Sequence, residues 1–518
     1  MDGAQKLRSL DASFLHLETR YTHMHIGGVA VFEPSPLGTG QALYDGIVQA
    51  IEPRLDLIPR YRQRLAYVPL RLDTPVWIDD QEFDISNHVV HAALPKPGGD
   101  RELQQFIARV FSRQLDRRRP LWELYIIEGL RDGRWALLTK THHAMVDGIS
   151  NLELTTILLD TEPDAPAARE ESSWEARGAP SPMGLLVSSL RDRLSRPGRL
   201  VNAARAVAEN PTRMAEALRD TASGVLAMAS TMRVPKSIIN GKTGASRGLA
   251  YSRFSLEDFR LVKNTYGGTI NDVVLATVAG GLRHFLIKRG VDPDDPQQAL
   301  QALCPVSIRD ATERTALGNR LAMLLVKLPI DERNPDLRVL RVRNVVDRLK
   351  ARKQAVGADF LLNLAGFAPA TLHATVARTS LRSIGFNLVV TNVPGPQVAL
   401  YCRGARMVEA FPIAFLYEGQ WLSVAIFSYL GWLNFGYLSD AHGIPDVDVF
   451  GKCVERSFNE LVRAARKRRE REERAAELPV ELTAVAAGGT TAKGSKSPRG
   501  RRRSAGGGAR AAAGGRAR

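Results

Sequence analysis

A stretch near the middle of the chain cannot contribute to a hydrophobic core. Residues 160–182, DTEPDAPAAREESSWEARGAPSP, are rich in Pro, Ala, Glu and Ser, and this composition is typical of a surface linker. On both sides of it, short apolar runs alternate with amphipathic stretches of helical period. Such alternation favours mixed sheets covered by helices. The sequence therefore predicts an α/β fold in two halves.

The first half supplies candidate strands and one helix. The segments SLDASFLHLE and MHIGGVAVFE have apolar and small residues in a pattern that predicts strands, and a helix is predicted around ELQQFIARVFSRQL. Two neighbouring strands, PLWELYIIEGL and RWALLTKTHH, follow, and the turn Arg131-Asp132-Gly133 joins them. The histidines His142 and His143 therefore lie at or just beyond the end of a strand.

The second half begins near Gly248 with a strand, a helix, a glycine turn and a long helix. Thr269 and Asp272 resemble a capping box at the start of this long helix, with Asp in place of the usual Glu. Later strands are predicted in ALCPVSIR, NRLAMLLVKLPI, FNLVVTNVPGP and WLSVAIFSYLGWLNFGYL, and later helices through Leu340 and Phe450. Ser, Gly and Asn interrupt the last of these runs, so it predicts strands and not a membrane span.

The segment between the halves, residues 183–233, has broken helical patterns. Leu186, Leu190 and Leu194 repeat at four-residue spacing beside basic residues such as Arg191. A basic amphipathic helix of this kind either packs on its own protein or lies on an anionic membrane surface. The sequence leaves both interpretations open.

Composition excludes several classes of protein. With 518 residues, 44% of them hydrophobic, the chain can bury a large core. Its three cysteines, Cys304, Cys402 and Cys453, are far apart and form no CxxC pair, which argues against a disulfide framework or a zinc ribbon and fits a reducing compartment. The N-terminal segment has no uninterrupted apolar stretch, so we expect no secretory signal.

The net charge of +16 is unevenly distributed. Residues 493–518 contain nine Lys or Arg and no acidic residue, in a Gly-, Ala-, Ser- and Arg-rich sequence that predicts a disordered tail. Such a tail binds anionic surfaces without specificity. It has no aromatic residues to stack on bases, so we expect no specific nucleic-acid partner.

Two adjacent histidines are the main candidates for chemistry. In LLTKTHHAMVDGIS (residues 137–150), Asp147 and Gly148 follow His142 and His143. One interpretation is a metal site, since His143 and Asp147 would share a helix face, but Gly148 indicates a turn and no cysteine or HExxH lies nearby. A second is a buried, hydrogen-bonded histidine. The third, acid–base catalysis, is favoured because a carboxylate and a glycine accompany the pair.

The other clustered histidines are His16, His23 and His25. They lie in apolar segments that look like strands, a setting that favours packing or the lining of a cavity. We therefore expect no metal site in this protein.

The residues from His142 to Gly148 match HHxxxDG, the signature of the acyltransferase superfamily that includes chloramphenicol acetyltransferase, carnitine acyltransferases and peptide-synthetase condensation domains. Three further stretches narrow the resemblance: PLWE at residues 120–123, NDVVLA at 271–276, and LDASFLHLE with MHIGG near the N-terminus. With these, the chain from about residue 8 to 465 resembles the bacterial wax ester synthase/diacylglycerol acyltransferase family. The Arg-rich tail matches no motif of that family.

The resemblance implies an α/β fold of two chloramphenicol acetyltransferase-like subdomains with a central channel, in which acyl-CoA enters from one face and the acceptor from the other. The subdomains would be residues 1–160, which carry HHxxxDG, and 245–465. Residues 161–244 would form the linker and an amphipathic helical crossover. Residues 466–518 would be the charged end of a helix and the basic tail.

The resemblance also implies roles for single residues. His143 would be the general base, since an imidazole with a pKa of about 6.5 can accept a hydroxyl proton near neutral pH. His142 would be its structural neighbour. Asp147 would orient the loop together with Gly148, and Arg309 is the expected partner of Asp147.

Two further motifs are candidates for supporting roles. Asn271 and Asp272 either cap the long helix or position the substrate at the reaction centre. Pro120, Leu121 and Trp122 are expected to anchor the strand that carries the histidines.

We therefore expect an acyl-CoA-dependent O-acyltransferase that acts on diacylglycerol and on long-chain alcohols. It would use acyl-CoA as a substrate and no cofactor, in the cytoplasm, at the inner membrane face or on lipid bodies. A condensation-type enzyme with another acceptor or a carrier-bound acyl group is the alternative, although no carrier domain is recognisable. A lipid-binding or nucleic-acid-associated protein is a third, and the intact HHxxxDG argues against it.

Overall fold

The structure is a computed structural model that describes residues 4–145, 159–164, 174–194, 237–307, 321–351, 356–357 and 385–477. Internal contacts group Met1–Lys467 into one unit and Arg468–Arg518 into a second. Asp147, Gly148 and Arg309 lie outside the described residues.

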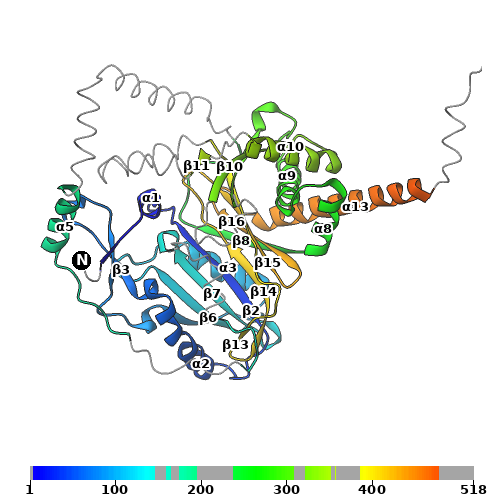
Figure 1. The fold of residues 1–518 in the computed structure, drawn as a ribbon. Helices are drawn as coiled ribbons and strands as arrows, with labels where there is room; N and C mark the ends of the chain where they lie inside the picture. The colour runs from blue at the N-terminus through cyan, green and yellow to red at the C-terminus, as the bar shows by residue number, and fades with distance from the viewer. Residues whose placement is uncertain are drawn as a thin grey trace, which may run out of the picture. The chain divides into compact units, whose positions relative to one another are not determined.

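The first of two large sheets has six strands, in the order β13-β14-β2-β7-β6-β5 (Figure 1). Neighbouring strands are antiparallel, except that β5 and β6 are parallel. Two of the strands come from the second half of the sequence and four from the first. In sheet order the strands are β13 (Tyr401–Cys402), β14 (Ala405–Ile413), β2 (His25–Phe32), β7 (Trp135–His142), β6 (Trp122–Glu128) and β5 (Val89–Ala93).

Helices bury both faces of this sheet. α3 (Asp100–Phe111) covers one face, where its Ile107 joins Val29 in an apolar cluster that also includes residues of the second large sheet. α2 (Gln41–Ile51) contributes Ile47 to the apolar cluster on the other face. Side chains alternate between the faces along each strand, so the sheet has an apolar core on both sides.

The second large sheet has seven strands, in the order β11-β10-β9-β12-β15-β16-β8. β12 is parallel to both of its neighbours, and the other pairs are antiparallel. In sheet order the strands are β11 (Val356–Gly357), β10 (Leu321–Leu328), β9 (Leu300–Ser307), β12 (Leu388–Val393), β15 (Leu422–Tyr429), β16 (Trp432–Asp440) and β8 (Arg247–Ser255).

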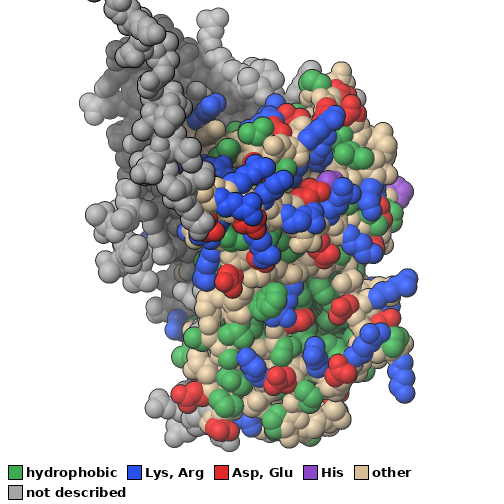
Figure 2. Space-filling model, turned by 90° about the vertical axis from the view of Figure 1, so that its right-hand side faces the viewer, with side chains coloured by type: hydrophobic (Ala, Val, Ile, Leu, Met, Phe, Trp, Pro, Cys, Tyr) green, Lys and Arg blue, Asp and Glu red, His purple; other side chains and the backbone are tan. Residues whose placement is uncertain are grey.

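A layer of helices lies on one face of the second sheet (Figure 1). Figure 2, which looks onto this side, shows Lys and Arg side chains gathered over the helices among Asp and Glu, and hydrophobic side chains below them. The helices of this layer are α8 (Leu256–Tyr266), α9 (Ile270–Lys288), α10 (Pro335–Ala351) and α13 (Val447–Glu477).

Among the described helices, α9 alone is long and apolar enough to cross a membrane by length and composition. In the structure, 78% of its most apolar window is buried inside the protein. Fourteen of its residues are buried, among them Val274, Val278, Leu282 and Phe285, which recur at helical spacing. This burial is what a core helix of an α/β layer requires.

A small sheet of three strands, β1 (Ala4–Lys6), β4 (Val76–Asp79) and β3 (Gln63–Ala66), stands apart from the large ones. α5 (Pro182–Leu194) packs on it through Leu185. The remaining described elements are α1 (Ser9–Leu17) and the 3-10 turns η1 (Pro53–Leu57), η2 (Pro59–Arg62), η3 (Pro69–Arg71), η4 (Ile85–Asn87), η5 (Arg131–Gly133), η6 (His143–Met145) and η7 (Pro296–Gln298).

One predicted element is wrong. The segment SLDASFLHLE, predicted as a strand, forms helix α1 and ends at Glu18. Its buried residues Asp11, Phe14 and Glu18 recur at intervals of three and four, which is the spacing of one helix face and not of a strand. The other predicted strands and helices named above lie where the sequence placed them, and the capping box of Thr269 and Asp272 is present.

Candidate active site

The histidine pair stands where the backbone leaves β7 and enters η6. The His142 N–H donates to the carbonyl of Leu121 at 2.9 Å, and the His143 N–H donates to the carbonyl of Met24 at 2.8 Å. His142 also lies directly opposite His25 in the β2–β7 ladder. Two separate segments of the first half, at residues 24–25 and at Leu121, therefore fix the backbone of the pair.

The His143 ring lies between two aromatic side chains. The ring of Phe14, from α1, is 4.0 Å away between centroids, and the ring of Phe415 meets it edge-on at 5.5 Å. The side chain keeps partial exposure, but its Nδ1 is buried without a hydrogen-bond partner among the described residues. The imidazole is thus held by apolar contacts and by its own backbone.

These surroundings determine the charge of His143. Burial, together with the charge of His142, lowers the pKa of His143 from its ordinary value of 6.5 to about 4. The ring is therefore neutral near pH 7, which is the form that can accept a proton.

His142 has a different environment. The Ala144 N–H donates to His142 Nδ1 at 3.1 Å, so a neutral His142 carries its proton on Nε2. Nε2 lies 3.6 Å from Glu18 Oε2. The two adjacent histidines therefore face opposite surroundings, one apolar and one beside a carboxylate.

Glu18 is the centre of a buried polar cluster that the sequence did not predict as part of the site. Its other oxygen, Oε1, lies 3.6 Å from His23 Nδ1 and 3.6 Å from His25 Nε2. Arg117 donates to Oε2 through Nε at 3.1 Å and through Nη2, and Nη2 also donates to the carbonyl of Leu15 at 3.0 Å. The carboxylate is only 1% exposed.

The charge state of this cluster follows from burial and from its partners. Burial would raise the pKa of Glu18, but His142 and Arg117 outweigh it and lower the pKa to about 2. Burial lowers the pKa of His23 to about 4, although Glu18 acts to raise it, and it holds the pKa of His25 well below the ordinary range. Glu18 is therefore an ionised carboxylate placed against the His142 side of the pair.

The PLW motif lies under the end of β7. Leu121 is fully buried, and Trp122 donates from Nε1 to the carbonyl of Tyr61 at 2.7 Å. The Trp122 ring stacks on His88 at 4.6 Å, and Pro120 begins this segment. These contacts hold the motif in place, so that the Leu121 carbonyl accepts the hydrogen bond from the His142 N–H.

The motif at the start of α9 is engaged in capping. Asp272 Oδ2 accepts from the Thr269 N–H at 2.7 Å and from the Thr269 hydroxyl at 2.8 Å. In the part of the chain that the structure describes, no hydrogen bond or ring contact joins Asn271 or Asp272 to His143. The role of Asn271 at the reaction centre stays a prediction, as do the roles of Asp147, Gly148 and Arg309.

Within the described ranges, no group of three or more His, Cys, Asp or Glu side chains is placed to hold a metal ion. Cys304, Cys402 and Cys453 are buried and unpaired by disulfides.

Two family models match the chain. The wax ester synthase/diacylglycerol acyltransferase catalytic domain matches residues 7–274, and the C-terminal domain of the same family matches residues 317–462. A probable diacylglycerol O-acyltransferase of Mycobacterium tuberculosis is 33% identical over 456 residues, which are 88% of this chain and 98% of that protein.

Solved structures agree with these matches. A wax ester synthase/diacylglycerol acyltransferase from Marinobacter aquaeolei VT8 has a TM-score of 0.63 at 26% identity, over 89% of this chain and 99% of its own. The starter condensation domain of rhizomide synthetase has a TM-score of 0.52 at 13% identity, over 90% of this chain and 95% of its own. The second likeness is one of fold alone.

Proposed function

Because the chain belongs to the wax ester synthase/diacylglycerol acyltransferase family, we propose that it transfers an acyl group directly from acyl-CoA to a hydroxyl group, with His143 as the general base. The protein is an acyltransferase, and the acceptor is diacylglycerol or a long-chain alcohol. A condensation-type enzyme with another acceptor is the alternative, and its relatives are distant.

The observation that carries the proposed mechanism is the position of the His143 ring at the end of β7, between Phe14 and Phe415. As the acceptor oxygen attacks the thioester carbonyl, the imidazole takes the hydroxyl proton. When the carbon–sulfur bond of the resulting intermediate breaks, the imidazolium gives this proton to the departing thiolate. An ester and free coenzyme A result, and neither a covalent acyl-enzyme nor a cofactor is needed.

The neighbouring groups would orient the base and position the substrate. His142, beside the ionised Glu18, orients the start of η6. Asp147 would hold the following loop through Arg309, and Asn271 would position the substrate or the carbonyl oxygen that becomes negative. Pro120, Leu121 and Trp122 would support the strand from below.

We further propose that the enzyme works in the cytoplasm on a lipid surface, at the inner membrane face or on lipid bodies. The support comes from α5, whose Met183, Val187 and Leu190 form one exposed stripe at helical spacing. Leu70, in the η3 turn that α5 contacts, is 83% exposed. An apolar stripe beside Arg191 is the surface expected of a helix lying in a lipid interface.

The mechanism is tested by incubating the purified protein with labelled palmitoyl-CoA and a mixture of diacylglycerol and hexadecanol. His143→Ala should lower product formation by roughly 10²- to 10⁴-fold, because only general-base assistance is removed. His284→Ala is the matched control, since His284 lies on α9 and pairs with Glu460 at 3.0 Å. Equal product from the wild type and His143→Ala would contradict the mechanism.

A further inference from the structure

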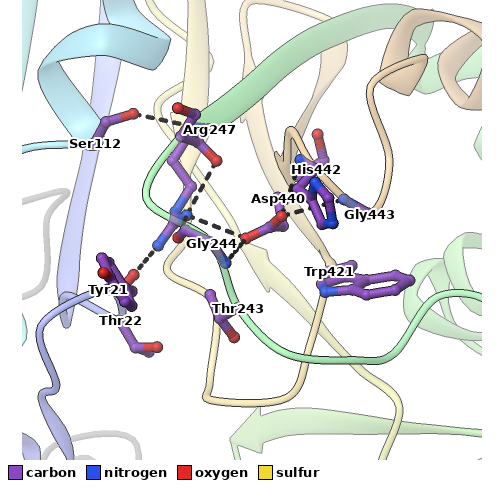
Figure 3. Close-up of polar contacts among 12 residues, drawn as sticks. Tyr21, Thr22, Ser112, Thr243, Gly244, Arg247, Trp421, Asp440, His442 and Gly443 are labelled. Carbon is purple, nitrogen blue, oxygen red and sulfur yellow. Dashed lines mark hydrogen bonds and ion pairs between the residues drawn. The ribbon is translucent and has the colours of Figure 1, made fainter.

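Arg247 is a buried arginine at the first position of β8, in the half of the sequence that does not carry the histidine pair. Its side chain is 3% exposed. Figure 3 shows it between Tyr21 on one side and Asp440 on the other, so that one guanidinium reaches both halves of the sequence.

Within the second half of the sequence, Arg247 is held by Gly244 and by Asp440. Its Nη1 donates to the Gly244 carbonyl at 2.8 Å and lies 3.4 Å from Asp440 Oδ2. Asp440 is fully buried, and its carboxylate also accepts the N–H groups of Gly244 at 2.6 Å, His442 at 3.0 Å and Gly443 at 3.2 Å.

Trp421 packs closely against the turn of Asp440 and Gly443 and so restricts its movement. A Cβ atom added at Gly443 would come within 2.0 Å of the indole, so the turn approaches the ring as closely as glycine permits. The indole Nε1 donates to the Lys242 carbonyl at 3.1 Å. Figure 3 shows Trp421 beside the turn of Asp440 and Gly443.

On the side of the first half, Arg247 holds two segments. Its Nη2 donates to the carbonyl of Tyr21, and its backbone N–H donates to Ser112 Oγ at 3.0 Å. Ser112 follows α3 and donates in turn to the Ala108 carbonyl at 2.7 Å. The guanidinium thus links the second sheet to the loop that runs from α1 into β2.

That loop carries the groups around the histidine pair. It begins after Glu18, which faces His142, and it ends with His23 and Met24, whose carbonyl accepts the His143 N–H. Within it, the Thr19 N–H donates to the Thr22 carbonyl at 2.9 Å, so the loop closes on itself. A displacement of Tyr21 is therefore transmitted to both sides of the pair.

We propose that Arg247, anchored by Asp440, is a positioning residue for acyl transfer: it fixes the loop of residues 19–24, and through that loop the ring of His143. The proposal rests on the proposed role of His143 as the base. An arginine is required because only its planar fork donates to Tyr21, Gly244 and Asp440 at once, whereas a lysine ammonium is a single point charge.

The test compares Arg247→Gln, Arg247→Lys and a matched control, Arg283→Gln. Arg283 is also a buried arginine, and it donates to Asp294 at 2.6 Å and to the Ile330 carbonyl at 2.8 Å, on α9. Palmitoyl-CoA turnover and amide hydrogen exchange are measured for each folded variant. Arg247→Gln should lower kcat roughly 10- to 100-fold with the KM for palmitoyl-CoA changed less than about threefold, because misplacement of the base affects chemistry and not binding.

Hydrogen exchange separates positioning from general destabilisation. Amides of residues 19–25 should exchange at least about tenfold faster in Arg247→Gln than in Arg283→Gln, and Arg247→Lys should fall between the wild type and Arg247→Gln in both measurements. Unchanged exchange of residues 19–25, or an unchanged kcat, would overturn the proposal. If Arg247→Gln does not fold, Arg247→Lys decides by the same two criteria.

The outcomes also distinguish this proposal from the proposed function. If His143→Ala keeps wild-type activity, the assignment of the base fails. Faster exchange of residues 19–25 in the Arg247 variants would still show that Arg247 holds the loop, while positioning for acyl transfer would be overturned along with the base.

Discussion

His143 lies between Phe14 and Phe415, and these apolar neighbours determine the protonation state of its ring. A solvated imidazole is partly protonated just below neutral pH, and a protonated ring cannot accept a proton. Burial removes this competition by lowering the pKa of His143 to about 4. The ring is a weaker base as a result, but it is always in the reactive form at neutral pH.

The same burial makes the protein sensitive to acid. In the folded protein the pKa values of His143 and His23 are about 4, against an ordinary value of 6.5. Between these values the unfolded chain binds protons that the folded chain does not bind, so the free energy of unfolding should fall as the pH drops from 6.5 to 4, by roughly 1–3 kcal/mol. Urea unfolding at several pH values measures this loss.

The pH dependence of activity should differ from that of stability. In the pH range where the protein stays folded, kcat/KM should show no titration near pH 6.5, because the base is already neutral there. A stability curve that is flat from pH 6.5 to 4.5, or an activity that falls with an apparent pKa near 6.5, would contradict the burial of these rings.

Only some of the residues that form the site could be predicted from the sequence. The pair His142 and His143 at a strand end follows from local pattern, and the structure places both there. The Glu18 cluster does not, because Arg117 lies 99 positions away from Glu18 and only the folded chain brings them together. The nearby histidines His23 and His25 are evident in the sequence, but nothing local indicates which carboxylate they surround.

At the scale of elements, the α1 segment shows why a short pattern misleads. Small and apolar residues in SLDASFLHLE fit a strand by composition, whereas the burial of Asp11, Phe14 and Glu18 at intervals of three and four fits a helix. The helix matters for the site because it brings Phe14 against His143 and leaves Glu18 beside His142. A strand would turn Asp11 and Phe14, three residues apart, to opposite faces, and would hold Phe14 and Glu18 about 13 Å apart.

α5 carries a prediction about lipid binding. Replacing Val187 and Leu190 with serine should weaken flotation with anionic liposomes by roughly tenfold, because about 2 kcal/mol of apolar transfer energy is removed from the exposed stripe. Ile287→Ser is the matched control, since Ile287 is a half-exposed apolar residue on α9. Equal flotation of the wild type and the double variant would show that another surface binds lipid.

The basic tail can be separated from α5 in the same experiment. Deleting residues 493–518 removes nine positive charges, so any part of the binding that depends on them should disappear and should be the salt-sensitive part. Binding that survives both the deletion and high salt belongs to the apolar stripe. DNA in place of liposomes tests whether the tail discriminates between anionic surfaces.

At the scale of the whole molecule, the two halves of the sequence share a sheet. β14 (Ala405–Ile413) pairs with β2 in the first sheet, and β13 extends that edge. Sequence patterns gave no sign of this exchange, since hydrophobic periodicity identifies a strand but not its partner. The arrangement predicts that neither half is stable alone.

A fragment of residues 1–160 should therefore aggregate and lack a cooperative unfolding transition, because the edge of β2 would present unpaired backbone groups. A protease site inserted in residues 165–173 offers the complementary test. After cleavage, the two pieces should elute together in size-exclusion chromatography under native conditions. A soluble, cooperatively unfolding 1–160 fragment would contradict this view of the sheet.

The ladder between β14 and β2 joins the halves through six residue pairs. Separating the two halves would break this ladder, so the ladder opposes any motion that pulls β14 away from β2. Under the proposed function, a long acyl chain would therefore enter the protein while both halves stay joined along this edge.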